Sequence, residues 1–385
     1  MGIPVERAAG FLDSFATYMR RLLASEGDQD AVRVTENLTT LTSRTMVGVV
    51  PRRHSRWARG SLQRRTRLAL QFSGSLSLGV DLSRNVPIEI FDRWDRHQVA
   101  TAPPSFDVLA IVTTFNEGDV IGRLIRRLLS HRVRVHVIDN WSTDQTLEIV
   151  ADFVKEGLVS VERFPIDGPP GHFEWEPLLG RVEEVAHGSG ANWVIHHDAD
   201  EIRESPWPGV DLVSAFWIAE QWGYNCVDHT VVNFRPVNDL WRPGEDLARS
   251  FMWFEFGDHP AHFVQLKAWK PQVSRVHIAA SGGHEAVFEG RRVFPYKFVT
   301  RHYPIRSQAH GERKIFQERQ PRWSPAERAK GWHTHYDHYE RGMSFIWDQA
   351  SLFRWEEVDQ RFLLQRLSGV GLPGNPWPNE GPISS

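Results

Sequence analysis

The sequence predicts an α/β fold in which a mostly parallel sheet is flanked by helices. From Phe106 onward, short apolar segments rich in β-branched residues alternate with segments whose apolar residues recur at helical spacing. This alternation is typical of parallel strands joined by helices that cover both faces of the sheet. A chain of 385 residues with 41% apolar and 24% charged residues can bury the core that such a fold needs.

Four strands and three helices are expected in the first half of this region. The strands are short apolar runs, expected at residues 106–115, 133–139, 158–164 and 193–197. The first helix is expected over Asp119–Ser130, where the apolar residues fall on one face. The second should open at Ser142, which has the capping-box spacing to Gln145, and continue to about Lys155. The third should end near Gly188.

Composition excludes several classes of protein. The net charge of -3 argues against a general nucleic-acid binder, which is usually strongly basic. The single cysteine, Cys226, rules out an internal disulfide and suits a reducing compartment. No apolar run is long enough to span a bilayer and the N-terminus lacks a signal-peptide core, so we expect a cytoplasmic protein.

A basic run extends from Arg52 to Arg67 without an acidic residue. One interpretation is a solvated face or a mobile segment. The other is a patch that binds an acidic partner or anionic lipid, which would give the protein a peripheral contact with a membrane.

Three polar loops follow the expected strands, and each contains a carboxylate. They cover Thr113–Glu117, Asp139–Asp144 and Asp198–Glu201. Ligands of parallel α/β sheets bind at the carboxyl ends of the strands. We therefore expect the three loops to form one site.

The motif Asp198-Ala199-Asp200 predicts a metal site within these loops. Residues two apart in extended backbone project to the same side, so both carboxylates can face one point. Such hard oxygen ligands suit Mg²⁺ or Mn²⁺, with substrate phosphates and water completing the coordination. The alternative interpretation is a polar turn that only ends the strand.

These loops carry a resemblance to a known family. The segments FDVLAIVTTFNEGDVIGRLIRRLLSH, VIDNWSTDQT and HHDADE, in that order, resemble the nucleotide-sugar domain of GT-A glycosyltransferases, in particular those of family 2. Residues 281–319 resemble the C-terminal part of one bacterial branch. The resemblance covers roughly residues 106–340.

The resemblance implies a GT-A type fold in three parts. A nucleotide-sugar-binding and catalytic domain would cover residues 105–305. A mainly helical C-terminal extension would follow at 306–385, and the partly helical, basic region 1–104 is left unassigned. The implied activity is metal-dependent, inverting transfer of a sugar from a nucleoside diphosphate sugar. The acceptor is open: a glycan, lipid, peptide or small molecule.

The resemblance also implies roles for individual residues. The donor would be held by Thr113, Thr114, Asn116, Glu117, Asp139, Asn140 and Asp198. Separately, the basic residues Arg306, Arg313 and Lys314 near an expected helix start would bind the diphosphate; the alternative interpretation is ordinary surface charge. The metal, Mn²⁺ or Mg²⁺, would bind Asp200 and Asp198, with a third ligand from His302 or His284. The general base would be Glu285, with Asp258 as the alternative.

Two rival functions use a similar sheet. A sugar nucleotidyltransferase would show a glycine-rich signature with Arg and Lys near its first strand, which the segment GDVIGRL does not match. A non-catalytic nucleotide-binding scaffold would lack the metal pair, whereas Asp198 and Asp200 are both present.

Overall fold

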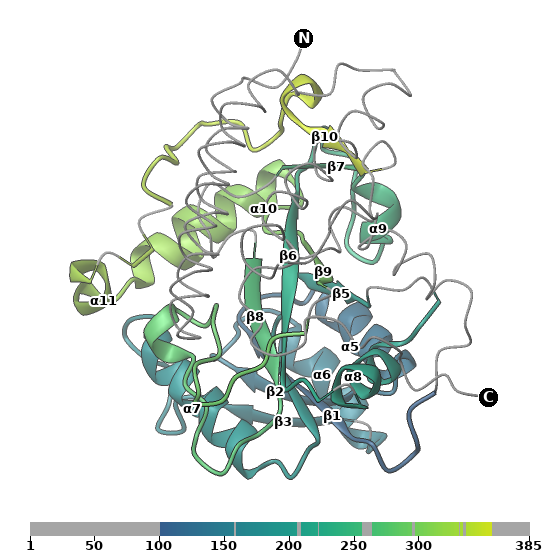
Figure 1. Ribbon diagram of the computed structural model, residues 1–385. Helices are drawn as coiled ribbons and strands as arrows, with labels where there is room; N and C mark the ends of the chain where they lie inside the picture. The colour runs from purple at the N-terminus through teal and green to yellow at the C-terminus, as the bar shows by residue number, and fades with distance from the viewer. Residues whose placement is uncertain are drawn as a thin grey trace, which may run out of the picture.

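The structure is a computed structural model that describes residues 101–157, 159–205, 209–221, 223–255, 264–294, 297–330, 332–333 and 336–355 (Figure 1). Within them the chain forms a mixed α/β fold with a central sheet flanked by helices, which confirms the predicted fold class. Residues 1–100, with the basic run, Asp258 and residues 356–385 lie outside the described ranges. The boundaries at 105 and 306 stay predictions.

One mixed sheet joins all the strands of the described residues. They are β1 Val108–Thr114, β2 Arg134–Asp139, β3 Val159–Arg163, β4 Trp193–Asp198, β5 Glu201–Glu204, β6 Cys226–Phe234, β7 Trp253–Glu255, β8 Val264–Trp269, β9 Phe298–His302 and β10 Phe353–Arg354. The order across the sheet is β10-β7-β6-β8-β4-β1-β2-β3, and β9 pairs with both β6 and β5.

The sheet has a parallel half and a mixed half. Strands β3, β2, β1 and β4 are parallel neighbours, and they are the four strands that the sequence predicts. Strand β8 runs antiparallel to β4 and to β6, whereas β9 runs parallel to β6 and antiparallel to β5. The carboxyl ends of β1, β2 and β4 therefore meet at one edge, as predicted.

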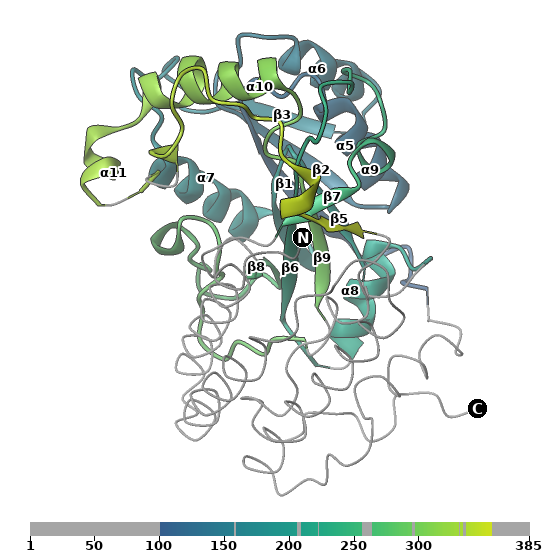
Figure 2. The ribbon, with the colours of Figure 1, turned by 90° about the horizontal axis from the view of Figure 1, so that it is seen from above.

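The described helices pack on both faces of the sheet (Figure 2). They are α5 Ile121–Ser130, α6 Thr146–Lys155, α7 Trp175–Gly188, α8 Leu212–Gln221, α9 Leu247–Ser250, α10 Gln308–Arg313 and α11 Pro325–Ala329. Short turns of 3₁₀-helix occur at η2 Ala279–Ser281, η4 Gln320–Arg322 and η6 Gln349–Ser351. No helix in the described ranges is long and apolar enough to cross a membrane.

Strand β1 is buried on both faces because its side chains alternate between two apolar clusters. Val108, Ala110 and Val112 belong to the cluster that contains the apolar face of α5. Leu109 and Ile111 belong to the cluster that contains α7. Figure 2 shows α5 and α7 on opposite sides of β1 and β2.

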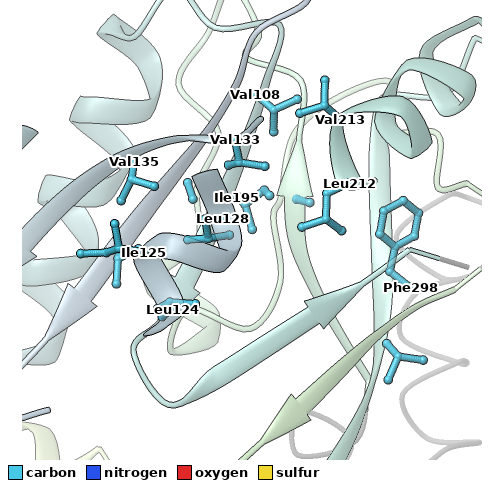
Figure 3. Packing of buried hydrophobic residues seen from close by; sticks show 14 of the residues in the cluster. Val108, Leu124, Ile125, Leu128, Val133, Val135, Ile195, Leu212, Val213 and Phe298 are labelled. Atoms are coloured by element: carbon cyan, nitrogen blue, oxygen red, sulfur yellow. The ribbon is translucent and has the colours of Figure 1, made fainter. Parts of the chain in front are cut away.

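The first cluster is the larger core of the protein. Leu128 of α5 packs there with Val133 and Ile195, and Leu212 of α8 and Phe298 of β9 extend it beneath the mixed half of the sheet (Figure 3). Burial of each such side chain contributes about 1.5–3 kcal/mol, so this core anchors the strands whose ends form the site.

The start of α6 differs from the predicted capping box. Ser142 does not cap the helix, because its hydroxyl donates to the buried Asp139 carboxylate at 2.5 Å. The helix begins at Thr146, and the side chain of Asp144 accepts from Thr146 N at 2.9 Å. The buried charge of Asp139 needs donors more than the helix end does, since the first turn of a helix can also reach water.

The C-terminal part begins with consecutive helical turns. Helix α10 continues without a break into a π-helix, η3 Lys314–Arg319, and then into η4. Two residues in extended backbone, Trp323 and Ser324, separate η4 from α11. The chain afterwards returns to the sheet, where β10 pairs antiparallel with β7. π-helical turns are rare and often occur at functional sites.

Candidate functional site

A cavity of about 650 Å³ lies at the carboxyl edge of the parallel strands. It is lined by Thr113–Phe115, Glu117 and Asn140 from the loops after β1 and β2, and by Asp198–Glu201 after β4. Strands β6, β7 and β9 and the π-helix η3 supply further lining residues. The three polar loops of the sequence prediction therefore share one cavity with the C-terminal segment.

Asp200 and His302 face each other at this cavity. His302 Nε2 lies 3.6 Å from Asp200 Oδ1, because β9 pairs with β5 and ends opposite the loop that carries Asp200. His302 Nδ1 lies 2.8 Å from the side-chain oxygen of Asn233 on β6. An amide oxygen only accepts, so Nδ1 carries a hydrogen, and Nε2 is the ring nitrogen that faces Asp200.

The other oxygen of Asp200 is paired with a lysine from the π-helix. Lys314 Nζ lies 2.7 Å from Asp200 Oδ2 and 3.0 Å from Glu117 Oε1, which ties the loop after β1 to the loop after β4. Burial alone would raise the pKa of Asp200, but Lys314 and His302 outweigh it and hold that pKa well below its ordinary value. Asp200 is therefore an anion at neutral pH.

Asp198 has a lysine partner of its own. Lys267 Nζ, on β8, lies 2.5 Å from Asp198 Oδ2 and 3.3 Å from Glu201 Oε1, and Thr113 Oγ1 donates to Asp198 Oδ1. Burial opposes ionisation of Asp198, yet Lys267 lowers the pKa of its carboxyl far below the ordinary range.

These residues fit a divalent cation at Asp200 and His302. Asp200 Oδ1 and His302 Nε2 face each other, and the second nitrogen of the ring is held by Asn233, as is usual for metal-ligating histidines. The described part of the chain contains no group of three or more His, Cys, Asp or Glu that could hold a metal. A cation here would take its remaining ligands from diphosphate and water, which suits Mg²⁺ or Mn²⁺.

Several residues predicted to bind the donor line the cavity at the ends of β1 and β2, and others do not line it but support the loops that do. Thr113, Thr114 and Asn140 line the cavity. Asn116 is not among the lining residues, and its side-chain oxygen accepts from Thr143 N at 2.8 Å, which joins the loops after β1 and β2. Asp139 is fully buried, and burial raises the pKa of its carboxyl although Ser142 donates to it.

Arg306 is a buried structural cation in this structure. It is fully buried, and its guanidinium pairs with Glu117 at 2.5 Å and with Asp119 at 2.8 Å. It also donates to Tyr303 O at 3.1 Å and is not among the lining residues of the cavity. Its sequence-based assignment to the donor phosphates therefore finds no geometric support, whereas Lys314 lines the cavity.

The SGGHE loop presents His284 to the cavity but turns Glu285 away. Gly283 has φ +85°, and a Cβ on it would lie 2.9 Å from His196 Cε1, so only glycine permits this close approach. His284 lines the cavity on the other side of this turn. Glu285 Oε1 instead pairs with Arg291 at 2.9 Å, and Glu285 is not a lining residue.

The histidines of the HTHYDHY run do not form a metal cluster within the described residues. His333 lines the cavity, its Nε2 lies 3.1 Å from Glu327 Oε2, and its ring stacks on Trp323 with an interplanar angle of 4°. His333 is therefore a packed residue of the cavity lining rather than a solvated side chain. His338 also lines the cavity, and His335 lies outside the described residues.

Comparison with known proteins identifies part of the chain. Residues 109–171 match the family model described as "Glycosyl transferase family 2". We refer to residues 109–171, which are similar to that family, as the family 2 segment. This segment holds β1, β2 and the loops with Thr113, Thr114 and Asn140, and it ends before Asp198. No curated protein matches the chain.

Solved structures align with this chain at low sequence identity and low TM-score. TarS 1-349 of S. aureus in complex with UDP is 12% identical, with 52% of this chain and 61% of that chain covered and a TM-score of 0.30. Glucosyl-3-phosphoglycerate synthase from Mycobacterium tuberculosis, in complex with Mn²⁺, UDP and glucosyl-3-phosphoglycerate, is 17% identical, with 34% and 44% covered and a TM-score of 0.23. The chain thus spans less than two thirds of each.

Sequence reasoning missed the residues that complete the cavity around the family 2 segment. They are Asn233 on β6, Arg235 just after β6, Glu255 on β7 and Arg319 of the π-helix. Lys267 on β8, which pairs with Asp198 but does not line the cavity, was missed as well. None of them belongs to a motif, and their strands lie in the mixed half of the sheet, which strand-helix alternation does not predict. Of the π-helix, sequence reasoning named only Lys314.

His229 should make the protein less stable in mild acid. It is fully buried on β6, and burial together with Arg203 holds its pKa well below 6.5. The unfolded chain binds a proton at this position below about pH 6.5, the folded protein does not, and stability therefore falls as the pH falls. Replacing His229 with Phe removes this titration. The slope of unfolding free energy against pH should then decrease by about 1.4 kcal/mol per pH unit between about pH 6 and 5.

Urea unfolding at several pH values measures this slope. The exposed His187, changed to Gln, is the control, because its ring reaches water in both states. An unchanged slope for His229→Phe would show that the buried ring takes up its proton before unfolding.

Proposed function

We propose that this protein is a metal-dependent glycosyltransferase. It moves a sugar, most simply a hexose, from a nucleoside diphosphate sugar to an acceptor hydroxyl, with inversion at the anomeric carbon in a single displacement. The observation that carries the proposal is the pairing of Asp200 Oδ1 with His302 Nε2 inside the cavity next to the family 2 segment. The cytoplasmic location and the membrane contact of residues 52–67 remain predictions from sequence.

The residues divide the work along the cavity. Thr113, Thr114 and Asn140 offer hydrogen-bonding groups to the nucleoside, and Arg322 holds the Asn140 side chain at 2.9 Å. Lys314 brings positive charge to the position of the diphosphate. A divalent ion bound by Asp200 and His302 would supply a Lewis acid that offsets charge on the leaving diphosphate. Asp198, held by Lys267, would accept hydrogen bonds from the donor.

A donor screen tests the proposal. Thermal shift with UDP-, GDP- and dTDP-sugars should show stabilisation that requires Mn²⁺ or Mg²⁺ and is lost on adding EDTA. A donor at about a hundred times its dissociation constant should stabilise the fold by roughly 2.7 kcal/mol. Absence of any shift for all of the donors and both metals would refute the donor class.

The products separate the proposal from its two rivals. A glycosyltransferase using water as a slow acceptor releases nucleoside diphosphate and free sugar, because the bond at the anomeric carbon breaks. A sugar nucleotidyltransferase acts instead on the bond between the two phosphates of the donor. It breaks that bond, or forms it from a nucleoside triphosphate and a sugar phosphate. A scaffold protein binds the donor and leaves it intact.

A further inference from the structure

The cavity extends beyond the donor-binding loops into the mixed half of the sheet. In the order β1-β4-β8-β6-β7, it begins at Thr113 and Thr114 and reaches Glu255 at the far end. Asp200 and His302 lie between these ends. If the nucleoside occupies the β1 end and the diphosphate meets Asp200, the sugar and the acceptor must occupy the part towards β7.

The register of the strands places a carboxylate in that part. Asn233 on β6 pairs with His302 on β9 at one side and with Glu255 on β7 at the other. Paired residues of neighbouring strands project to the same face, and strands lie about 4.8 Å apart, so Glu255 stands roughly 10 Å from His302 along this row. All three residues line the cavity. That separation leaves room for a hexose ring between the diphosphate position and Glu255.

Within the described residues, four carboxylates other than Glu255 line the cavity, and each pairs with a buried lysine or arginine. Glu117 pairs with Arg306 and Lys314, Glu201 with Arg203 and Lys267, Asp198 with Lys267 and Asp200 with Lys314. Glu117 and Glu201 are 4% and 2% exposed, too little to meet an acceptor.

Arg235 holds Glu255 in a defined orientation. Its Nε and Nη2 lie 3.0 and 2.8 Å from the same oxygen, Glu255 Oε1. The guanidinium itself stacks on Trp347, with its carbon 4.8 Å from the ring centroid. Arg235 and Trp347 also line the cavity. Arg235 is thus held between Glu255 and Trp347, and it fixes the Glu255 carboxylate in turn. A carboxylate fixed in this way loses little freedom when a ligand binds.

We infer that Glu255 is the general base of the transfer, an assignment that rests on the proposed function. The acceptor oxygen forms a bond to the anomeric carbon, and its proton passes to the Glu255 carboxylate. The bond from the anomeric carbon to the diphosphate breaks, and the nucleoside diphosphate leaves with the electron pair. Arg235 acts as a positioning residue for Glu255. Glu285, which pairs with Arg291 and does not line the cavity, has no part in this step.

Glu255→Gln tests the assignment with water as the acceptor. The probes are UDP-glucose, UDP-GlcNAc, GDP-mannose and dTDP-glucose, each with Mn²⁺, and the readout is release of nucleoside diphosphate. The amide cannot take a proton, so release should fall by about 10²–10⁴-fold. Donor affinity, measured by calorimetry, should stay within about twofold, because the nucleotide and metal contacts belong to other residues. Glu285→Gln, measured beside it, should keep the parent rate, and Glu184→Gln on the exposed face of α7 is the matched control.

Sodium azide separates a base from a residue that only supports the fold. Azide is an anion and needs no proton removed, so it should restore release in Glu255→Gln and yield a glycosyl azide by mass spectrometry. A merely structural loss would not respond to azide. Glu255→Asp, which keeps a carboxylate on a shorter chain, should retain part of the activity and shows whether the position tolerates change.

The outcomes distinguish this assignment from the proposed function. If the parent protein binds and cleaves none of the four donors, the proposed function fails. If the parent cleaves a donor and Glu255→Gln does so at the same rate, only the assignment of Glu255 fails. Loss of donor affinity in Glu255→Gln would also overturn it and make Glu255 a donor ligand.

Discussion

Asp200→Asn is expected to lower metal-dependent cleavage of the donor by about 10³-fold or more, which corresponds to about 4 kcal/mol of transition-state stabilisation. The amide keeps the size of the side chain but removes the negative charge that faces His302 Nε2 at 3.6 Å. The affinity for Mn²⁺, followed by electron paramagnetic resonance without any donor, should fall in parallel. The fold should persist, because Lys314 keeps its ion pair with Glu117.

Asp152→Asn is the matched control for this change. Asp152 lies on the surface of α6, where it pairs with Lys155 at 2.9 Å and its side chain is 71% exposed. This variant should match the parent in Mn²⁺ affinity and in donor cleavage. If Asp200→Asn also retains the parent rate and Mn²⁺ affinity, the cation does not bind at Asp200.

Arg306→Met should lower the free energy of unfolding by about 3–5 kcal/mol, the range found when one partner of a buried ion pair is removed. The change takes away the fully buried guanidinium that pairs with Glu117 and Asp119. In the folded protein both carboxylates lie against that charge, and methionine offers them no hydrogen bond. The denaturant midpoint of the purified variant measures the loss.

Arg134→Met provides the comparison for an exposed ion pair. Arg134 pairs with Asp107 at 2.6 Å, but the two side chains are 48% and 37% exposed, so the expected cost is only about 0–1 kcal/mol. The competing assignment of Arg306, to the donor diphosphate, makes the opposite prediction. Under it, Arg306→Met would weaken donor affinity strongly and leave the denaturant midpoint close to that of the parent.

The local pattern of apolar residues was sufficient to predict the parallel half of the sheet. The periods of the apolar residues predict β1 to β4 and the helices between them, because each strand and helix buries a face that its own sequence defines. The rule that parallel strands end at one edge then brings Thr113, Asn140 and Asp198 to one cavity. The Ser142 cap failed for the complementary reason. Its hydroxyl serves Asp139, a residue buried by the tertiary structure rather than by its neighbours in sequence.

The charged network of the site could not be predicted in this way. Glu117 and Lys314 are 197 positions apart, Glu117 and Arg306 are 189 apart, and Asp198 and Lys267 are 69 apart. Nothing in a local pattern indicates which of many cations meets which carboxylate, since the desolvation that makes these pairs matter exists only after folding. The same holds for Glu285, whose position beside a histidine suggested chemistry, although the folded chain leaves Glu285 outside the cavity lining.

The sequence by itself therefore determined the α/β class, the polar edge of the parallel strands and the family 2 resemblance, all of which follow from short-range periodicity and motif order. The tertiary structure decided which charged groups pair with each other and which face the cavity. The pairing of β6 with β7 and β9 sets Glu255, Asn233 and His302 in one row, and the π-helix brings Lys314 to Asp200. Ion pairs and strand registers are long-range contacts, and their energies depend on burial that no single segment of the chain contains.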